Sequence, residues 1–512
     1  MRSLRIIRWG IATLSLLLTT IFFMDFANLV PPLFISSMLA LQAGPAIIHA
    51  LSVSGLALSG LAVVLAATLL VGRVYCSHLC PLGTLQDVFI WTAKRNFKHR
   101  KFPYIKPHYL LHYGISFIMI AAALCGSLFM LNFFEPFSSF GRILSNIIRP
   151  LVVLLNNVAA LVLMKQQVFF LYEIPLKGLA LSVVAATIIF LVGLFWLSYY
   201  HGRFFCNTLC PVGGVLSLVS RFSIFHITIQ NDQCIDCGLC ERVCRARCID
   251  STKRQIDFAA CVGCFDCISS CPTLGMKYAH RKNKGDLRPP VDAGRRGVLA
   301  AASSGMLMLV GMNEQALSEN PTYEESQRTP VVAPGARSIH RFTNRCTACH
   351  LCVSTCPTHV LQPSFLEFGL AGLMQPRMDY SVNYCNFDCT LCGQVCPTGA
   401  IQSILVEEKK LLQIGKTHFA KEDCIVETKK TDCGACSEHC PTKAVRMVPY
   451  GNLRIPEVDN QYCIGCGACE HACPAAPRKA IFVKSNTVHG IAKKREEANL
   501  PSPVSTPQEF PF

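Results

Sequence analysis

The stretch Cys234-Ile-Asp-Cys-Gly-Leu-Cys-Glu-Arg-Val-Cys244 places four cysteines at the spacing C-x2-C-x2-C-x3-C. Three further groups repeat this spacing, and two variants open with a gap of three or eight residues. Together the six groups hold 24 of the 30 cysteines in the chain. The groups are Cys234, Cys237, Cys240 and Cys244; Cys261, Cys264, Cys267 and Cys271; Cys346, Cys349, Cys352 and Cys356; Cys463, Cys466, Cys469 and Cys473; and the variants Cys385, Cys389, Cys392 and Cys396, and Cys424, Cys433, Cys436 and Cys440.

This spacing predicts iron–sulfur clusters. Three cysteines on one turn present sulfurs to three corners of a four-iron cubane, and the fourth, on a short helix, ligates the neighbouring cluster. Zinc ribbons use two separated pairs instead, and disulfide scaffolds are short secreted chains. We therefore expect six [4Fe–4S] clusters. Their charge, about −12 in total, would offset much of the formal net charge of +16, so the basic balance does not indicate nucleic acid.

Exchange of the fourth cysteine also predicts the ligand sets. In the first cysteine-rich region we expect Cys234, Cys237 and Cys240 with Cys271, and Cys261, Cys264 and Cys267 with Cys244. In the second region four groups have to pair. If the outer two pair with each other and the inner two likewise, the insertions of the inner groups become loops. That arrangement gives the sets Cys346, Cys349, Cys352 and Cys473; Cys463, Cys466, Cys469 and Cys356; Cys385, Cys389, Cys392 and Cys440; and Cys424, Cys433, Cys436 and Cys396.

The composition excludes a wholly soluble enzyme. Only 16% of the 512 residues are charged, against about a quarter in ordinary soluble proteins, and the mean hydropathy is +0.36. Four apolar runs reach the length of about 20 residues that a membrane span needs. These runs are Leu4–Met24, Leu51–Val71, Tyr109–Phe134 and Gly178–Tyr200. Two further stretches, Leu29–Ala50 and Leu151–Met164, contain prolines or are too short, which favours interfacial or re-entrant segments.

The distribution of lysine and arginine predicts the orientation in an inner (cytoplasmic) membrane. Basic residues gather at the N-terminus, in the loop 92–108 and in the segment 281–296, and these parts are expected to be cytoplasmic. The pair Arg295-Arg296 directly precedes the apolar run Gly297–Met312, which is the order of a twin-arginine export signal. We expect this run to be a fifth span or signal-anchor that carries the chain to the periplasmic face.

The predicted fold is an α-helical membrane domain with four spans in a duplicated unit, plus a fifth span or signal-anchor, joined to two α+β ferredoxin-like polycluster domains. The expected boundaries are 1–222 for the membrane domain, 223–290 for a cytoplasmic two-cluster domain, 291–314 for the fifth span, 315–340 for a linker, 341–485 for a periplasmic four-cluster domain and 486–512 for a flexible tail.

A second motif is repeated within the membrane domain. Residues 72–83, GRVYCSHLCPLG, match residues 202–213, GRFFCNTLCPVG, at seven of twelve positions. Each copy directly follows an apolar run on the expected cytoplasmic side. Packing of the two copies about a pseudo-twofold axis would gather Cys76, Cys80, Cys206 and Cys210, enough for a seventh iron–sulfur cluster. The alternative is a set of structural or disulfide-forming thiols.

Residues 1–290 resemble the membrane ferredoxin-type H subunit of the periplasmic nitrate reductase (Nap) quinol dehydrogenase system. The features that carry this resemblance are the four spans, the two Cys-x3-Cys-Pro repeats and the groups at 234–271. Residues 294–485 resemble the twin-arginine-exported G subunit of the same system, because Arg295-Arg296 is followed by four cysteine groups. The resemblance implies a fusion of the two. It further implies oxidation of menaquinol or ubiquinol from the membrane pool, and electron transfer to a periplasmic reductase or cytochrome-type acceptor, with room for further membrane subunits.

Two other functions stay open from the sequence. One is a transmembrane electron conduit from a cytoplasmic donor, and the other is a redox maturation or assembly factor. For quinol oxidation, a proton acceptor has to lie close to the headgroup. Asp25 and Glu135 follow phenylalanine-rich ends of the first and third runs, and acids at a membrane edge are functional candidates by default. His49, at the end of an apolar loop segment, is the third candidate.

Overall fold

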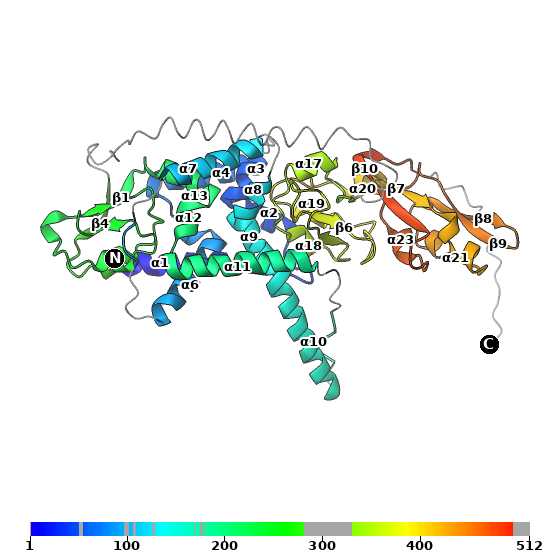
Figure 1. The fold of residues 1–512 in the computed structure, drawn as a ribbon, viewed down its shortest axis with the longest axis horizontal. Coiled ribbons are helices and arrows are strands. Elements are labelled where there is room, and N and C mark those ends of the chain that lie inside the picture. The colour runs from blue at the N-terminus through cyan, green and yellow to red at the C-terminus, as the bar shows by residue number, and fades with distance from the viewer. Residues whose placement is uncertain are drawn as a thin grey trace, which may run out of the picture.

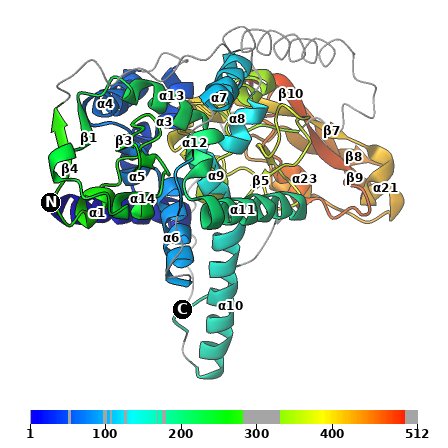
Figure 2. The same cartoon turned by 60° about the vertical axis from the view of Figure 1, so that its left-hand side comes forward.

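Figures 1 and 2 show a helical domain at the centre of the molecule with one cysteine-rich domain at either end. This computed structural model describes residues 2–50, 55–96, 102–105, 109–124, 128–167, 169–174, 178, 180–280 and 330–494. The expected fifth span at 297–312, with its two arginines, lies outside these residues.

Apolar helices and the short helices that join them make up the central domain. In chain order they are α1 (Arg2–Met24), α2 (Pro32–Ala40), α3 (Ala43–Ala50), α4 (Gly55–Val71), α5 (Tyr75–His78), α6 (Pro81–Asn96), α7 (Tyr109–Leu124), α8 (Phe129–Phe134), α9 (Pro136–Ile143), the π-helix η1 (Leu144–Ile148), α10 (Arg149–Lys165), α11 (Leu181–His201), α12 (Phe204–Thr208) and α13 (Pro211–Ser220).

Within the described residues, three helical stretches are long and apolar enough to cross a membrane: Ser3–Met24, Pro136–Lys165 and Leu181–His201. The first and third coincide with predicted spans. Helices α4 and α7 fall in the other two predicted spans but have only 17 and 16 residues. Helices α2 and α3 meet at 95°, the geometry of a broken span or a re-entrant loop.

The run Leu151–Met164 belongs to a longer helix, so its length alone does not exclude a span, and its expected interfacial or re-entrant position stays a prediction. Pro150 stands just after the π-turn η1, at the junction of α9 and α10. The π-turn η1 then joins α10 to α9, so that one continuous helical stretch of 30 residues forms. In both views α10 projects away from the other helices (Figures 1 and 2).

The two copies of the repeated motif form the same order of elements. An apolar helix ends at a glycine with positive φ, Gly72 (87°) or Gly202 (67°). A short helix then carries the first cysteine, and a longer helix begins at the proline of the motif, Pro81 or Pro211. Each motif therefore turns the chain sharply at one end of the helical domain.

The domain at that end contains short elements and two-stranded antiparallel sheets. They are β1 (Phe225–Ile229), η2 (Asn231–Gln233), α14 (Leu239–Val243), β2 (Ile249–Asp250), β3 (Gln255–Ile256), α15 (Asp266–Ser270) and β4 (Met276–His280). Strand β1 pairs with β4, with Phe225 opposite His280 and Ile229 opposite Met276, and β2 pairs with β3. We call this unit the first ferredoxin domain.

The domain at the opposite end has a similar construction, and we call it the second ferredoxin domain. Its elements are α17 (Ile339–Thr343), α18 (Leu351–Thr355), β5 (Leu361–Pro363), β6 (Pro376–Met378), α19 (Leu391–Gln394), α20 (Val406–Leu411), β7 (Leu412–Phe419), η5 (Lys421–Asp423), α21 (Ile425–Thr428), α22 (Ala435–Glu438), β8 (Val445–Tyr450), β9 (Leu453–Val458), α23 (Ala468–Ala472) and β10 (Ile481–Ile491). The strand pairs are β5 with β6, β7 with β10 and β8 with β9, all antiparallel.

Two predicted boundaries of this domain need correction. The sequence predicts a flexible tail from residue 486, but β10 continues to Ile491 and pairs with β7. It also predicts a linker that extends to residue 340, but Val332, Ala333 and Ala336 are buried in the core of the domain.

A buried carboxylate joins the helical domain to the first ferredoxin domain. Asp87 on α6 forms ion pairs with Arg8, Arg203 and Arg245 at 2.9–3.0 Å. Arg245 also pairs with Asp266 at 2.7 Å. Arg245 occupies the position that proline holds after the other five cysteine groups, so this ion-pair network accounts for the departure from the pattern.

Replacing Asp87 by asparagine should destabilise the protein by about 3–5 kcal/mol, because three buried guanidinium groups would lose their shared counter-charge. The lowered unfolding midpoint can be measured by a thermal melt in detergent. Glu407→Gln, which removes an exposed partner of Lys410, is the matched control and should leave the midpoint unchanged. Equal midpoints in both variants would contradict this role for Asp87.

Candidate iron–sulfur centres

The first ferredoxin domain gathers its cysteines around two small cavities. One is lined by Cys234, Cys237, Cys240 and Cys271. The other is lined by Cys244, Cys261, Cys264 and Cys267, together with Cys248. These two sets are the ones predicted from the exchange of the fourth cysteine between neighbouring groups. The fold therefore brings the predicted ligands of each cluster together.

Backbone geometry around the second cysteine is the same in the four groups with regular spacing. The residues on either side of it have positive φ, between 51° and 80°; they are Asp236 and Gly238, Gly263 and Phe265, Ala348 and His350, and Gly465 and Gly467. Successive residues of this kind turn their N–H groups into a concavity that suits anions, as in many iron–sulfur sites. The same conformation is absent around Cys389 and Cys433 in the two variant groups.

The predicted pairing of the four groups in the second ferredoxin domain is wrong. Neighbouring groups pair instead, because α18 packs on α19 and α22 packs on α23. Cys396 lies beside Cys346, Cys349 and Cys352, and Cys356 beside Cys385 and Cys392. Likewise Cys473 lies beside Cys433 and Cys436, and Cys440 beside Cys466 and Cys469. The two pairs of groups also form two separate buried cores.

The four sets of this domain follow one another outward from the helices. The set with Cys349 is innermost, since the carbonyl oxygen of Cys349 closely approaches Gly141 of α9. The set with Cys385 comes next. It contacts the set with Cys466, because the Cys385 N–H donates to the carbonyl oxygen of Cys466 at 3.0 Å. The set with Cys436 is outermost, near β8 and β9 (Figure 1).

The helical domain brings its four repeated cysteines together. Cys76, Cys80, Cys206 and Cys210 belong to one buried cluster, and each is 4–5% exposed. The Gly83 N–H donates to Sγ of Cys80 at 3.4 Å, and the Gly213 N–H donates to Sγ of Cys210 at 3.3 Å. We call these four residues the membrane quartet.

Among the described residues, no group of three histidine, cysteine or acidic side chains lies close enough to hold one metal ion.

The three predicted quinol residues do not form one site. The Asp25 carboxylate accepts from the backbone N–H groups of Leu29 and Val30, which closes a loop. Glu135 is fully buried and caps α9 by accepting from the N–H groups of Phe137 and Ser138. Only His49 lines a large cavity.

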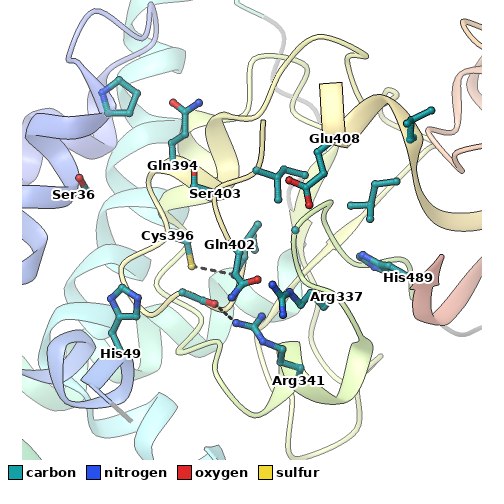
Figure 3. A pocket seen from close by; sticks show the side chains of 18 of the residues that line it. Ser36, His49, Arg337, Arg341, Gln394, Cys396, Gln402, Ser403, Glu408 and His489 are labelled. Carbon is teal, nitrogen blue, oxygen red and sulfur yellow. Dashed lines mark hydrogen bonds between the residues drawn. The ribbon is translucent and has the colours of Figure 1, made fainter. Parts of the chain in front are cut away.

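That cavity, of about 1280 Å³, lies between the bent pair α2–α3 and the second ferredoxin domain. We call it the groove. Cys396 of the innermost set lines it, and a Cβ at Gly399 would lie only 2.9 Å from Nε2 of His49. Figure 3 shows His49 entering from α3 and His489 from β10, with Arg337 and Arg341 between them in this view.

The sequence does not single out His489, because it predicts a flexible tail over residues 486–512. Both of its ring nitrogens are buried and make no hydrogen bond within the part of the chain that the structure describes. Burial lowers the pKa of His489 to about 4, so the ring is neutral near pH 7. The run of β-branched and aromatic residues from Ile481 to Val488 is the signal that could have predicted the strand.

Comparisons with known families agree with the cysteine geometry. A 4Fe-4S binding domain matches residues 53–100, 183–229 and 392–412, and the first two ranges contain the repeats of the membrane quartet. A 4Fe-4S dicluster domain matches residues 345–400, which hold two neighbouring groups, and residues 431–476, which hold the group at 463–473 and three cysteines of its neighbour, Cys433, Cys436 and Cys440. A second dicluster family matches residues 253–357, which run from the first ferredoxin domain into the second.

Similar proteins include ferredoxin-type and electron-transport proteins. An uncharacterised protein of Methanocaldococcus jannaschii is 28% identical over 43% of this chain and 68% of its own length. The putative electron transport protein YccM of Escherichia coli is 26% identical over 40% of this chain and 50% of its own. The ferredoxin-type protein NapF of Escherichia coli is 25% identical over 30% of this chain and 85% of its own. No solved structure matches. The predicted resemblance to ferredoxin-type proteins is thereby confirmed.

Combining cysteine substitutions tests the corrected pairing. Cys349→Ser should remove about four iron atoms per chain. Adding Cys396→Ser should remove no more, because both residues serve the same cluster, whereas adding Cys473→Ser should remove about four further atoms. Iron analysis of anaerobically purified protein gives the numbers. If adding Cys473→Ser removed no further iron and adding Cys396→Ser removed about four further atoms, the pairing of the outer groups with each other would be correct instead.

Proposed function

This chain is an iron–sulfur electron-transfer protein of the ferredoxin type, and we propose that it oxidises membrane quinol and delivers the electrons to a periplasmic reductase or electron carrier. The resemblance to the Nap quinol dehydrogenase subunits supports the proposal. A quinol releases two electrons and two protons, whereas each cluster accepts a single electron. A row of clusters therefore suits the division of a two-electron donor into single steps.

The observation that carries this proposal is the position of the groove. Its floor includes Cys396, a ligand of the innermost set of the second ferredoxin domain. One wall comes from Pro32, Leu33 and Ser36 of α2. Leu33 is 77% exposed, as a side chain facing lipid would be. A quinol arriving from the bilayer along α2 would thus come close to the first cluster of the row.

Two imidazoles suit the chemistry expected in the groove. His489 carries buried ring nitrogens without a partner among the described residues, and its lowered pKa keeps it neutral. A neutral ring can accept a hydrogen bond from one quinol hydroxyl and then its proton as the electron leaves. His49 lies against the loop that carries Cys396, on the opposite side of the groove in Figure 3, and is the second candidate acceptor.

The membrane orientation belongs to the same proposal. The first ferredoxin domain would be cytoplasmic and the second periplasmic in an inner membrane. Support comes from the basic residues at the N-terminus and in the loop 92–108, and from the position of the two domains at opposite ends of the helices. Residues 297–312 would make the additional crossing.

A transmembrane electron conduit is the second candidate. Its support is the order of the cysteine sets, which continue from the first ferredoxin domain through the membrane quartet to the second. In this function a cytoplasmic reductant would load the first ferredoxin domain, and quinol would be unnecessary. Reduction of the clusters by a reduced soluble ferredoxin but not by quinol would favour the conduit.

Reduction kinetics test the quinol site. With decylubiquinol or menadiol as donor, His489→Ala combined with His49→Ala should slow cluster bleaching by at least about tenfold, because both candidate proton acceptors are lost. Bleaching by dithionite should not change, since the clusters remain. His340→Ala, an exposed histidine outside the groove, serves as the control. Unchanged quinol-driven rates in the double variant would place quinol oxidation elsewhere or exclude it.

A further inference from the structure

The membrane quartet has no role in the quinol site, yet it is among the most deeply buried features of the chain. We infer that Cys76, Cys80, Cys206 and Cys210 bind a seventh [4Fe–4S] cluster, which links the clusters of the two ferredoxin domains through the helical domain. This inference is independent of the quinol proposal, since it concerns electron passage between the ends of the molecule and not the source of the electrons.

The charges around the quartet call for a buried anion. Arg73 is 1% exposed, and no carboxylate pairs with it in the described residues. Its guanidinium donates to Oδ1 of Asn207 and to the carbonyl of Ala259, and lies 4.0 Å from Sγ of Cys76. A buried cation is costly without a counter-charge. Thiolates on a cluster at this position would supply that charge.

Arg203 repeats the arrangement from the other copy of the motif. Its Nη1 lies 3.8 Å from Sγ of Cys206 and donates to the carbonyl of Cys76 at 2.9 Å. Arg73 in turn donates to the carbonyl of Cys206 at 3.0 Å. Each arginine thus reaches across to the opposite copy. A four-iron cluster with four thiolates carries about −2 when oxidised, which the two guanidinium groups would offset in part, because Arg203 is shared with Asp87.

The glycine of each motif makes room for this crossing. A Cβ at Gly83 would lie 2.3 Å from the carbonyl oxygen of Cys76 and 2.7 Å from Nη1 of Arg203. A Cβ at Gly213 would lie 2.2 Å from the carbonyl oxygen of Cys206 and 3.1 Å from Nη2 of Arg73. The same glycines donate their N–H groups to Cys80 and Cys210. N–H donors of this kind stabilise thiolates and tune cluster potentials.

On one side the quartet adjoins the first ferredoxin domain directly. Arg73 bridges Cys76 to the carbonyl of Ala259, two residues before Cys261. The Ser77 hydroxyl donates to the carbonyl of Gly263, which lies between Cys261 and Cys264. A single layer of backbone therefore separates the quartet from the set that contains Cys261.

On the other side a packed route leads towards the second ferredoxin domain. The Tyr75 hydroxyl donates to Oε1 of Gln42 at 3.0 Å and accepts from the Ala43 N–H at 3.1 Å. Gly44 packs against the Glu135 side chain, which caps α9. Helix α9 then brings Gly141 against Cys349. One continuous buried core contains the quartet, Cys261 and Cys349, so no open solvent interrupts this route.

The chemistry required of the seventh cluster is a one-electron exchange. A cluster held by these four thiols would supply that exchange: it would take one electron from the neighbouring cluster on one side and pass the same electron to the cluster on the other. No bond forms or breaks, and the donor and acceptor are the clusters held by the sets with Cys261 and Cys349. The buried site therefore needs no proton path.

Iron content is the direct test. Anaerobically purified full-length protein should contain about 28 iron atoms per chain, and Cys76→Ser combined with Cys206→Ser should contain about 24. Ser220→Ala, a buried serine on α13 without contact to the quartet, should keep the full number. About 24 atoms in the unmodified protein, or the same content in the double variant, would overturn the inference.

A second variant covers the case in which the double variant fails to fold. Arg73→Gln retains all four thiols, so iron content should be unchanged. Removing a positive charge beside the quartet should lower the reduction potential of the seventh cluster more than that of its neighbour at Cys261, which a redox titration followed by electron paramagnetic resonance would resolve. Unchanged potentials for all clusters, or a shift confined to one of the six other clusters, would overturn the inference. Neither readout involves quinol, so failure here leaves the quinol proposal intact, and the reverse holds as well.

Discussion

Exchange of the fourth cysteine between neighbouring groups is the constraint on which the ferredoxin domains depend. Each set takes three thiols from one loop and the fourth from the end of a short helix in the next loop, as with Cys271 and Cys244 in the first domain. Two loops are thereby tied to each other at two points. Short helices and two-stranded sheets could not bury enough apolar surface to fix this arrangement alone, so the thiol sets take the place of a larger core.

The same principle operates on a larger scale at the membrane quartet. There, two thiols come from each copy of a motif, and the copies lie about 130 residues apart in the chain. The crossed arginines and the carboxylate of Asp87 hold the two copies against each other and against the first ferredoxin domain. Buried charge, which is rarely a source of net stability by itself, serves here to fix which surfaces meet.

Much of this organisation could be predicted from the sequence. Cysteine spacing predicted the sets of the first domain, and the repeat predicted that Cys76, Cys80, Cys206 and Cys210 would meet, because both features are local patterns with a fixed geometric meaning. The pairing in the second domain could not be predicted in this way. Four groups admit several pairings, and the contacts of α18 with α19 and of α22 with α23 decide between them. His489 was missed for a related reason, since its position depends on the long-range pairing of β10 with β7. The fifth span lies outside the described residues and stays a prediction.

We propose that seven clusters follow one another from one end of the molecule to the other. A cryo-electron microscopy map of the anaerobically purified protein tests this row most directly, because four-iron clusters scatter far more strongly than the surrounding protein. Seven such densities are expected in a row, the third enclosed by Cys76, Cys80, Cys206 and Cys210 and the fourth bound by Cys346, Cys349, Cys352 and Cys396. A map with six densities and an empty space between the quartet thiols would contradict it.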